Sequence, residues 1–271
     1  MFRIIGIGKV GCSVATHFDK LPQYDVTLLD EEVLGTYSNM EECEKKVNTK
    51  KFSAIARRFR KDEEVLIITQ GSDSLNGCLL LLGQKISKCK VSLLHIYPDL
   101  SLSTLTERTN NKITFGVLQE MTRSGLFERF YVASIEEVEK HLDNVSLSEM
   151  NQKIGELVFG MLSMLIYFDH TTPARSNYER NKEAVRLCTI GYFDEQNNEH
   201  SLFPLENIKE KIYYYGIPEE EFNTERLKQI KQHQIALNQR ENNSFFKAYA
   251  LSGDETHRYF VHLTDIPQIS D

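Results

Sequence analysis

Two short turns contain the residue types that could hold a phosphate group. The first has the pattern Gly-x-Gly-x-x-Gly, formed by Gly6, Gly8 and Gly11, with Lys9 inside it and Cys12 directly after it. Glycine permits a tight turn from a strand into a helix, and it lets backbone N–H groups at the start of that helix approach an anion. This turn therefore predicts binding of a nucleotide phosphate.

The second turn follows an apolar segment at residues 64–69. Its candidate phosphate-binding residues are Gly71, Ser72, Asp73, Asn76 and Gly77. An acid is unfavourable in such a turn, because the carboxylate of Asp73 repels phosphate unless a metal lies between them. The second turn thus has a glycine at each end and a negative charge in the middle.

Strands and helices must hold these two turns in place. Phe2 to Ile5 is a short apolar strand, the chain is then helical to about Leu21, and Tyr24 to Leu29 is a second strand. Further along we expect a polar helical region at 37–63, strands at 64–69, 91–97 and 126–133, and helices at 78–86, 103–124 and 135–141. This alternation predicts an α/β fold with a Rossmann-like parallel sheet, with both turns at the same edge of that sheet.

A long helix from about Ser146 to Phe168 is apolar on nearly every face in its second half, so it must be covered on all sides. After it we expect strands at 186–193, 245–251 and 258–263, and helices at 205–215 and 218–239. The predicted organisation is a nucleotide-binding-type domain at 1–146, the central helix and its following loop at 147–183, and a smaller α+β domain at 184–271.

The order of these elements resembles that of the FtsZ/tubulin family from residue 1 to about 183. In that family a glycine loop, a glycine-rich phosphate loop, a proline-ended strand and a long central helix follow one another. The segment from Gly8 to Gly11 looks like the tubulin version of the first loop, whereas Asp73, Ser74 and Leu75 stand where the family has three glycines. The resemblance implies a sheet of the tubulin/FtsZ type, GTP or GDP as ligand, and subunits that assemble into filaments.

The same resemblance gives a base-contacting position on the central helix. The family has an aromatic residue followed four positions later by Asp or Asn, and Leu147 and Asn151 have that spacing here. A shift of the alignment by three would place Ile154 at the polar position instead. Asn151 is otherwise a solvated helix residue.

The resemblance also gives candidate catalytic residues, in the loop that begins at Pro173. Asn177 and Glu179 are similar to the first two polar members of the family's pattern, but Lys182 replaces the final acid and Glu183 lies one place beyond it. A lysine cannot accept a hydrogen bond from the attacking water. The resemblance therefore implies that hydrolysis is impaired.

Composition excludes several other classes of protein. A net charge of -7 argues against general attraction to nucleic acid. The five cysteines are scattered without a Cys-x-x-Cys pair and the histidines lack ligand spacing, so we expect neither disulfides nor a metal site. No apolar run reaches the ~18 residues needed to cross a membrane, and a cytoplasmic location is expected.

Three hypotheses follow. The first is a tubulin-like protein that self-assembles, binds a guanine nucleotide weakly and hydrolyses it poorly. The second is a pseudo-GTPase scaffold or regulator that binds another protein, such as a true FtsZ, without nucleotide. The third is a dinucleotide-sensing Rossmann domain in which Asp30 contacts a ribose hydroxyl.

Overall fold

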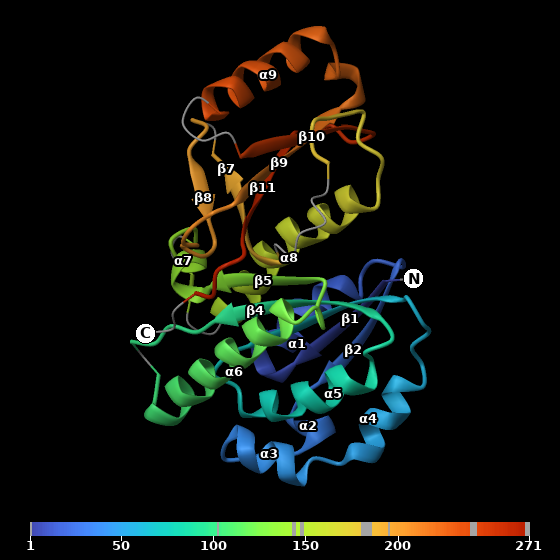
Figure 1. Cartoon of the computed structure of the whole chain (residues 1–271), viewed down its shortest axis with the longest axis vertical. Coiled ribbons are helices and arrows are strands. Elements are labelled where there is room, and N and C mark those ends of the chain that lie inside the picture. The colour runs from blue at the N-terminus through green and yellow to red at the C-terminus, as the bar shows by residue number, and fades with distance from the viewer. Residues whose placement is uncertain are drawn as a thin grey trace. The chain divides into compact units, whose positions relative to one another are not determined.

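The computed structural model describes residues 2–101, 103–142, 145–146, 149–179, 186–194, 196–238 and 243–268. The chain divides into two compact units, one formed by Met1–Phe159 with Pro267–Asp271 and the other by Gly160–Ile266. Figure 1 labels most of the helices and strands of both units. None of the helices in the described ranges has the length and apolar character that a membrane span requires.

The first unit contains a five-stranded parallel sheet in the order β2-β1-β3-β4-β5. Its strands are β1 (Phe2–Ile7), β2 (Tyr24–Leu29), β3 (Glu64–Gln70), β4 (Lys90–Tyr97) and β5 (Arg129–Ser134). The centres of β1, β3 and β4 are completely buried, as expected for a parallel sheet with both faces covered. The predicted α/β fold with a parallel sheet is confirmed.

The strand order defines where a ligand could bind. The chain runs from β1 outward to β2, and then returns to place β3 on the other side of β1. Ligands of open α/β sheets bind outside the carboxyl ends of the strands at such a point of reversal. This order also differs from the order 3-2-1-4-5-6 that is typical of dinucleotide-binding folds.

Polar side chains cap several helices of the first unit, among them α2, α3, α4 and α6. The helices of this unit are α1 (Gly8–Phe18), α2 (Glu31–Leu34), α3 (Met40–Lys46), α4 (Thr49–Ala56), α5 (Leu79–Lys85), α6 (Leu105–Arg123) and α7 (Ile135–Glu139), with a short 3-10 helix η1 (Ser74–Cys78). The polar region expected to be helical at 37–63 forms two helices, because Asn39 caps α3 and Asn48 caps α4. Thr104 and Glu107 form a capping box that starts α6.

The predicted central helix is α8 (Met150–Asp169), a continuous helix of 20 residues. Its first half belongs to the first unit and packs on α1. Phe159 stacks on His17 at 5.7 Å between ring centroids and meets Phe18 edge-on at 4.8 Å. Gly155 lies against the same side of α1, where an added Cβ would be 3.1 Å from His17.

The second unit contains a mostly antiparallel sheet in the order β8-β7-β11-β9-β10-β6. Among its described strands, β9 and β10 pair in parallel and the other neighbours pair antiparallel. The strands are β6 (Arg175–Ser176), β7 (Leu187–Phe193), β8 (Glu199–Ser201), β9 (Glu210–Pro218), β10 (Ser244–Leu251) and β11 (His257–Thr264). Helix α9 (Thr224–Asn238) packs through Ile230 on Tyr213, Tyr215 and Ile217 of β9. On the other face, Phe168 of α8 stacks on Tyr249 at 4.5 Å.

The helix predicted at 205–215 is wrong, because this region contains the central strand β9. Eight of the nine residues of β9 are buried, so the strand lacks the polar alternation that reveals a half-exposed strand. Its three consecutive tyrosines are suited to a strand covered on both faces.

Candidate functional site

The first turn is built so that α1 starts directly at the end of β1. Gly8 has a positive φ of 70°, a conformation that glycine adopts readily. Gly11 lies against β3, where an added Cβ would be 2.3 Å from the backbone oxygen of Ile68. Gly6 is equally crowded, since its Cβ would lie 2.7 Å from the oxygen of Gly11. These glycines therefore hold α1 tightly on β1 and β3.

The second turn meets the first through the side chain of Asp73. The Lys9 N–H group donates to Asp73 Oδ2 at 3.3 Å, and the Leu75 N–H group donates to Asp73 Oδ1 at 2.9 Å. Asp73 is thus the N-cap of η1 and also contacts the N-terminus of α1. The two turns lie together at the carboxyl ends of β1 and β3.

Burial shapes the electrostatics of this contact. Desolvation raises the pKa of Asp73, and the N–H groups of Leu75 and Lys9 oppose the shift, while the nearby Glu31 raises it further. Burial also raises the pKa of the Cys12 thiol to about 11. Cys12 is therefore a protonated packing residue at neutral pH, and its Sγ contacts the Gly6 oxygen at 3.4 Å.

Asn76 and Gly77 hold the second turn in place through contacts within the turn and with α3. The Asn76 amide donates to the oxygens of Gln70 at 2.6 Å and Gly71 at 3.2 Å, and its Oδ1 accepts from Thr69. Gly77 packs on α3, because an added Cβ would be 2.1 Å from the Met40 oxygen. Both residues stabilise the shape of the turn.

The polar side chains of His95, Asn110 and Asn111 lie beside the second turn, and the sequence alone did not predict this arrangement. An added Cβ on Gly71 would be 2.0 Å from Asn111 Oδ1 and 2.6 Å from His95 Cε1. The neighbouring Asn110 donates to the Ser72 oxygen at 3.2 Å. These residues come from β4 and α6, and the only sequence signals were a histidine inside an apolar strand and an Asn-Asn pair in a helix.

The environment of His95 keeps its ring neutral. The ring is completely buried and lies 5.2 Å from the Phe115 ring and 5.8 Å from the Phe130 ring between centroids. Burial lowers the pKa of His95 to about 3, and the side chain of Asn111 opposes this only in part. His95 is a neutral support for the second turn at physiological pH.

The start of α8 lies beside α1. Ser13 Oγ donates to the Asn151 backbone oxygen at 3.3 Å, which places Asn151 near the helix that follows the first turn. Leu147, the other predicted base-contacting residue, lies outside the described residues. Asp30, which the dinucleotide hypothesis assigns to a ribose, caps α2 by accepting from the Val33 N–H group at 3.0 Å.

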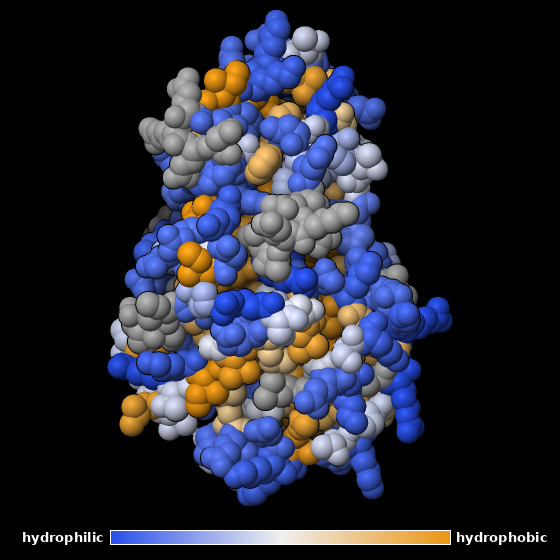
Figure 2. All heavy atoms as spheres, viewed as in Figure 1, coloured by the Kyte–Doolittle hydropathy of each residue, from blue (hydrophilic) through white to orange (hydrophobic). Residues whose placement is uncertain are grey.

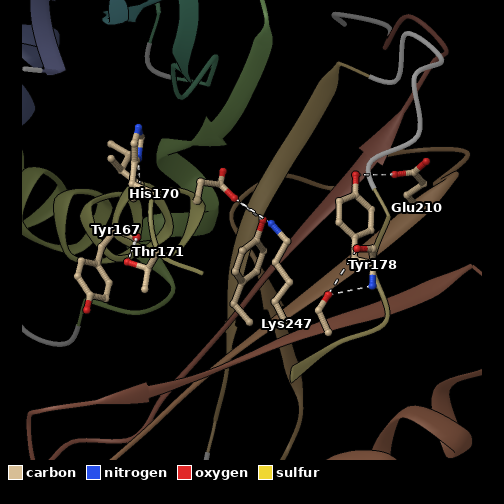
Figure 3. Close-up of polar contacts among 10 residues, drawn as sticks. Tyr167, His170, Thr171, Tyr178, Glu210 and Lys247 are labelled. Atoms are coloured by element: carbon tan, nitrogen blue, oxygen red, sulfur yellow. Dashed lines mark hydrogen bonds and ion pairs between the residues drawn. The ribbon is translucent and has the colours of Figure 1, made fainter. Parts of the chain in front are cut away.

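The predicted catalytic loop belongs to the second unit, and Figure 3 shows its surroundings. Asn177 is held by β10: its N–H group donates to the Phe246 oxygen at 3.2 Å, and its Oδ1 accepts from the Phe246 N–H group at 2.7 Å. Glu179 is exposed. Lys182 and Glu183 lie outside the described residues.

Lys247 of β10 contacts residues that precede and follow β6. Its Nζ atom lies 3.1 Å from Asp169 Oδ1 at the end of α8, and 5.3 Å and 5.0 Å from the ring centroids of Tyr178 and Tyr214. The Tyr178 hydroxyl also donates to Glu210 at 3.3 Å (Figure 3). Residues of β9 and β10 thus contact the end of α8 and the residue Tyr178 that follows β6.

Among the residues that the structure describes, no group of three or more His, Cys, Asp or Glu side chains is arranged to hold a metal ion.

Comparison with known proteins identifies the fold. No protein-family model matches the sequence, and no curated protein matches it. Solved structures do match. CetZ2 from Haloferax volcanii, in a GTPgS-bound protofilament, has a TM-score of 0.72 and 12% identity, with 98% of this chain and 94% of that chain covered.

Two further structures agree over similar lengths. TubZ from Bacillus thuringiensis serovar israelensis, in GDP-form protofilaments, has a TM-score of 0.72 and 14% identity, covering 97% of this chain and 83% of that chain. An empty FtsZ dimer from M. jannaschii has a TM-score of 0.68 and 12% identity, covering 97% and 87%. The chain has the FtsZ/tubulin fold.

Proposed function

We propose that this protein assembles head to tail into filaments. The observation that carries the proposal is the extent of the structural match, which covers nearly all of this chain and 83–94% of structures that were solved as protofilaments or as a dimer. Other neighbours are two-stranded and four-stranded TubZ filaments. Heterologous contacts that do not close into a ring give open polymers of this kind.

The surface of the first unit offers apolar area for such contacts. Leu105, Ile113 and Val117 of α6 are 82%, 50% and 38% exposed. Apolar side chains are visible near α6 on the face shown in Figure 2, among a mainly hydrophilic surface. Exposed apolar groups of this kind favour association between proteins.

We further propose that a guanine nucleotide binds weakly at the carboxyl ends of β1 and β3, and that its hydrolysis is impaired. Binding is supported by the point of strand reversal and by the N–H groups at the start of α1. Weakness is supported by Asp73, whose carboxylate already accepts from Lys9. Impaired hydrolysis is supported by the lysine at position 182 in place of an acid.

Titration calorimetry with GTP, GDP and NADH, combined with light scattering, tests this function. The proposal expects measurable but weak binding of GTP and GDP and no binding of NADH. It also expects the scattering per unit mass of protein to rise with protein concentration, because assembly raises the average mass of the particles. Selective NADH binding would overturn the guanine assignment.

A charge reversal on α1 locates the nucleotide. Lys9 is exposed at the helix start and Lys20 is exposed just beyond its end. Lys9→Glu is expected to abolish nucleotide binding, because it adds a negative charge beside the phosphate position. Lys20→Glu makes the same charge change at the other end of the helix and should leave affinity unchanged.

A second candidate function is a pseudo-GTPase that binds another protein without nucleotide. The contact between Asp73 and the start of α1 favours it, because this contact fills the position that a phosphate would need. If this second function is correct, calorimetry would detect no binding of GTP, GDP or NADH. Addition of GTP would also leave the light scattering unchanged.

A further inference from the structure

The negatively charged group at the N-terminus of α1 belongs to a residue that is distant in sequence. Ile7, at the N-cap position, provides no side-chain hydrogen bond, and the first turn of α1 contains no acidic residue. The carboxylate of Asp73, which is 64 positions from Lys9 in sequence, accepts from the Lys9 N–H group instead. Helix N-termini favour an anion at this position.

The carboxylate also occupies the space directly over the first turn. A Cβ atom added to Gly8 would lie only 1.8 Å from Asp73 Oδ2 and 2.5 Å from Asp73 Cγ. A phosphate oxygen that approached the backbone at Gly8 and Lys9 would meet the same atoms. The two anions cannot share this volume.

Asp73 is fixed in this position by its second oxygen. Oδ1 accepts from the Leu75 N–H group at 2.9 Å, which makes Asp73 the N-cap of η1. Turning the carboxylate away from α1 would therefore also uncap η1. Glu31 adds a further negative charge nearby.

We propose that Asp73 determines ligand choice at this edge of the sheet, with its carboxylate occupying the position of a ligand phosphate at the N-terminus of α1. The inference rests on the proposed nucleotide site and explains why that site would bind phosphate weakly. Replacing Asp73 by a small neutral residue opens the position to an inorganic phosphate group.

Pyrophosphate without divalent cations is the probe, because it lacks a base and a ribose and reports only on the phosphate position. In Asp73→Ser, the hydroxyl group still caps η1, while the space over Gly8 becomes free. Calorimetry should show pyrophosphate binding at least tenfold more tightly to Asp73→Ser than to the unaltered protein. Asp73→Asn removes the charge but keeps the volume, so it should give a smaller gain.

Glu31→Gln is the matched control, since it removes one nearby negative charge without vacating the position. It should change pyrophosphate affinity by less than threefold. A gain as large as that of Asp73→Ser would show that general charge is responsible, and would overturn the proposal. Equal binding to the unaltered protein and Asp73→Ser, or no binding to either, would also overturn it.

The amide signal of Lys9 in an NMR spectrum gives a second readout that also reports on folding. Pyrophosphate should shift this signal in Asp73→Ser and leave it unchanged in the unaltered protein.

These measurements also separate failure of this inference from failure of the proposed function. If Asp73→Ser binds pyrophosphate but neither binds GTP nor forms filaments, the role assigned to Asp73 is supported and the proposed function is overturned. Tight GTP binding by the unaltered protein with equal pyrophosphate affinities would instead overturn the role of Asp73 and leave nucleotide binding in place.

Discussion

Asn177 and Phe246 are joined by two hydrogen bonds, one of which uses the Asn177 side chain as an acceptor at 2.7 Å. This contact fastens β6 to β10 and makes Asn177 a structural residue of the loop. Asn177→Ala should lower the free energy of unfolding by about 0.5–1.5 kcal/mol, the usual value of one hydrogen bond. Chemical denaturation measures the change.

Asn177→Asp is the matched control, because Asp keeps the acceptor oxygen that Phe246 uses. Its stability should stay within about 0.5 kcal/mol of the unaltered protein. Equal losses for Ala and Asp would contradict the assigned hydrogen bond.

Gly77 is expected to tolerate no side chain. An added Cβ would be 2.1 Å from the Met40 oxygen and 2.9 Å from Cys43 Cβ, so Gly77→Ala should cost about 1–3 kcal/mol through overpacking. Gly116 lies within α6 with no neighbour inside 4 Å of its added Cβ. Gly116→Ala should therefore stabilise the protein by about 0.5–1 kcal/mol. Urea denaturation of the two variants measures whether each substitution lowers or raises the free energy of unfolding. A Gly77→Ala variant as stable as the unaltered protein would contradict the close packing of η1 on α3.

Phe168 is expected to be a main packing residue of the second unit. It is fully buried and stacks on Tyr249 at 4.5 Å and Tyr214 at 5.9 Å between centroids. Phe168→Ala should cost about 3–5 kcal/mol. Its neighbour Tyr167 is 46% exposed, so Tyr167→Ala should cost far less. Thermal unfolding followed by circular dichroism compares the two, and similar losses would show that the helix is rotated from its described position.

His95 makes stability depend on pH. Because its folded pKa of about 3 is below the ordinary value of 6.5, the unfolded chain binds a proton between these values and the folded protein does not. The contribution of the neutral His95 side chain to the free energy of unfolding is therefore complete above pH 6.5, and it is lost as the pH falls toward 3. One such group gives a slope of up to about 1.4 kcal/mol per pH unit.

His95→Gln removes this titration. Between about pH 7 and pH 5 the unaltered protein should lose about 2 kcal/mol more stability than the variant. The comparison uses the change with pH, so a general loss of stability in the variant does not affect it. Identical pH profiles would mean that His95 is accessible to protons in the folded protein.

The sequence was most informative where local chemistry decides the structure. Glycines between an apolar strand and a helix predicted the start of α1, and the parallel sheet followed from the alternation of elements. Strand β9 was missed because burial on both faces removes the polar alternation that distinguishes a strand.

The detailed contacts of the site depend on residues far apart in the sequence. The acid at position 73 was expected to repel phosphate, but only the fold shows that its carboxylate reaches Lys9. His95 and Asn111 lie on different elements, and nothing in their local sequence indicates that they meet below Gly71. Such convergence arises from tertiary packing, which periodicity does not encode.

Electron microscopy of the purified chain, combined with sedimentation across a range of concentrations, is the decisive test of self-assembly. Filaments of repeating subunits should appear above a threshold concentration, and the pelleted fraction should rise with each further addition of protein. A chain that stays monomeric at every concentration, with and without GTP, would contradict head-to-tail assembly.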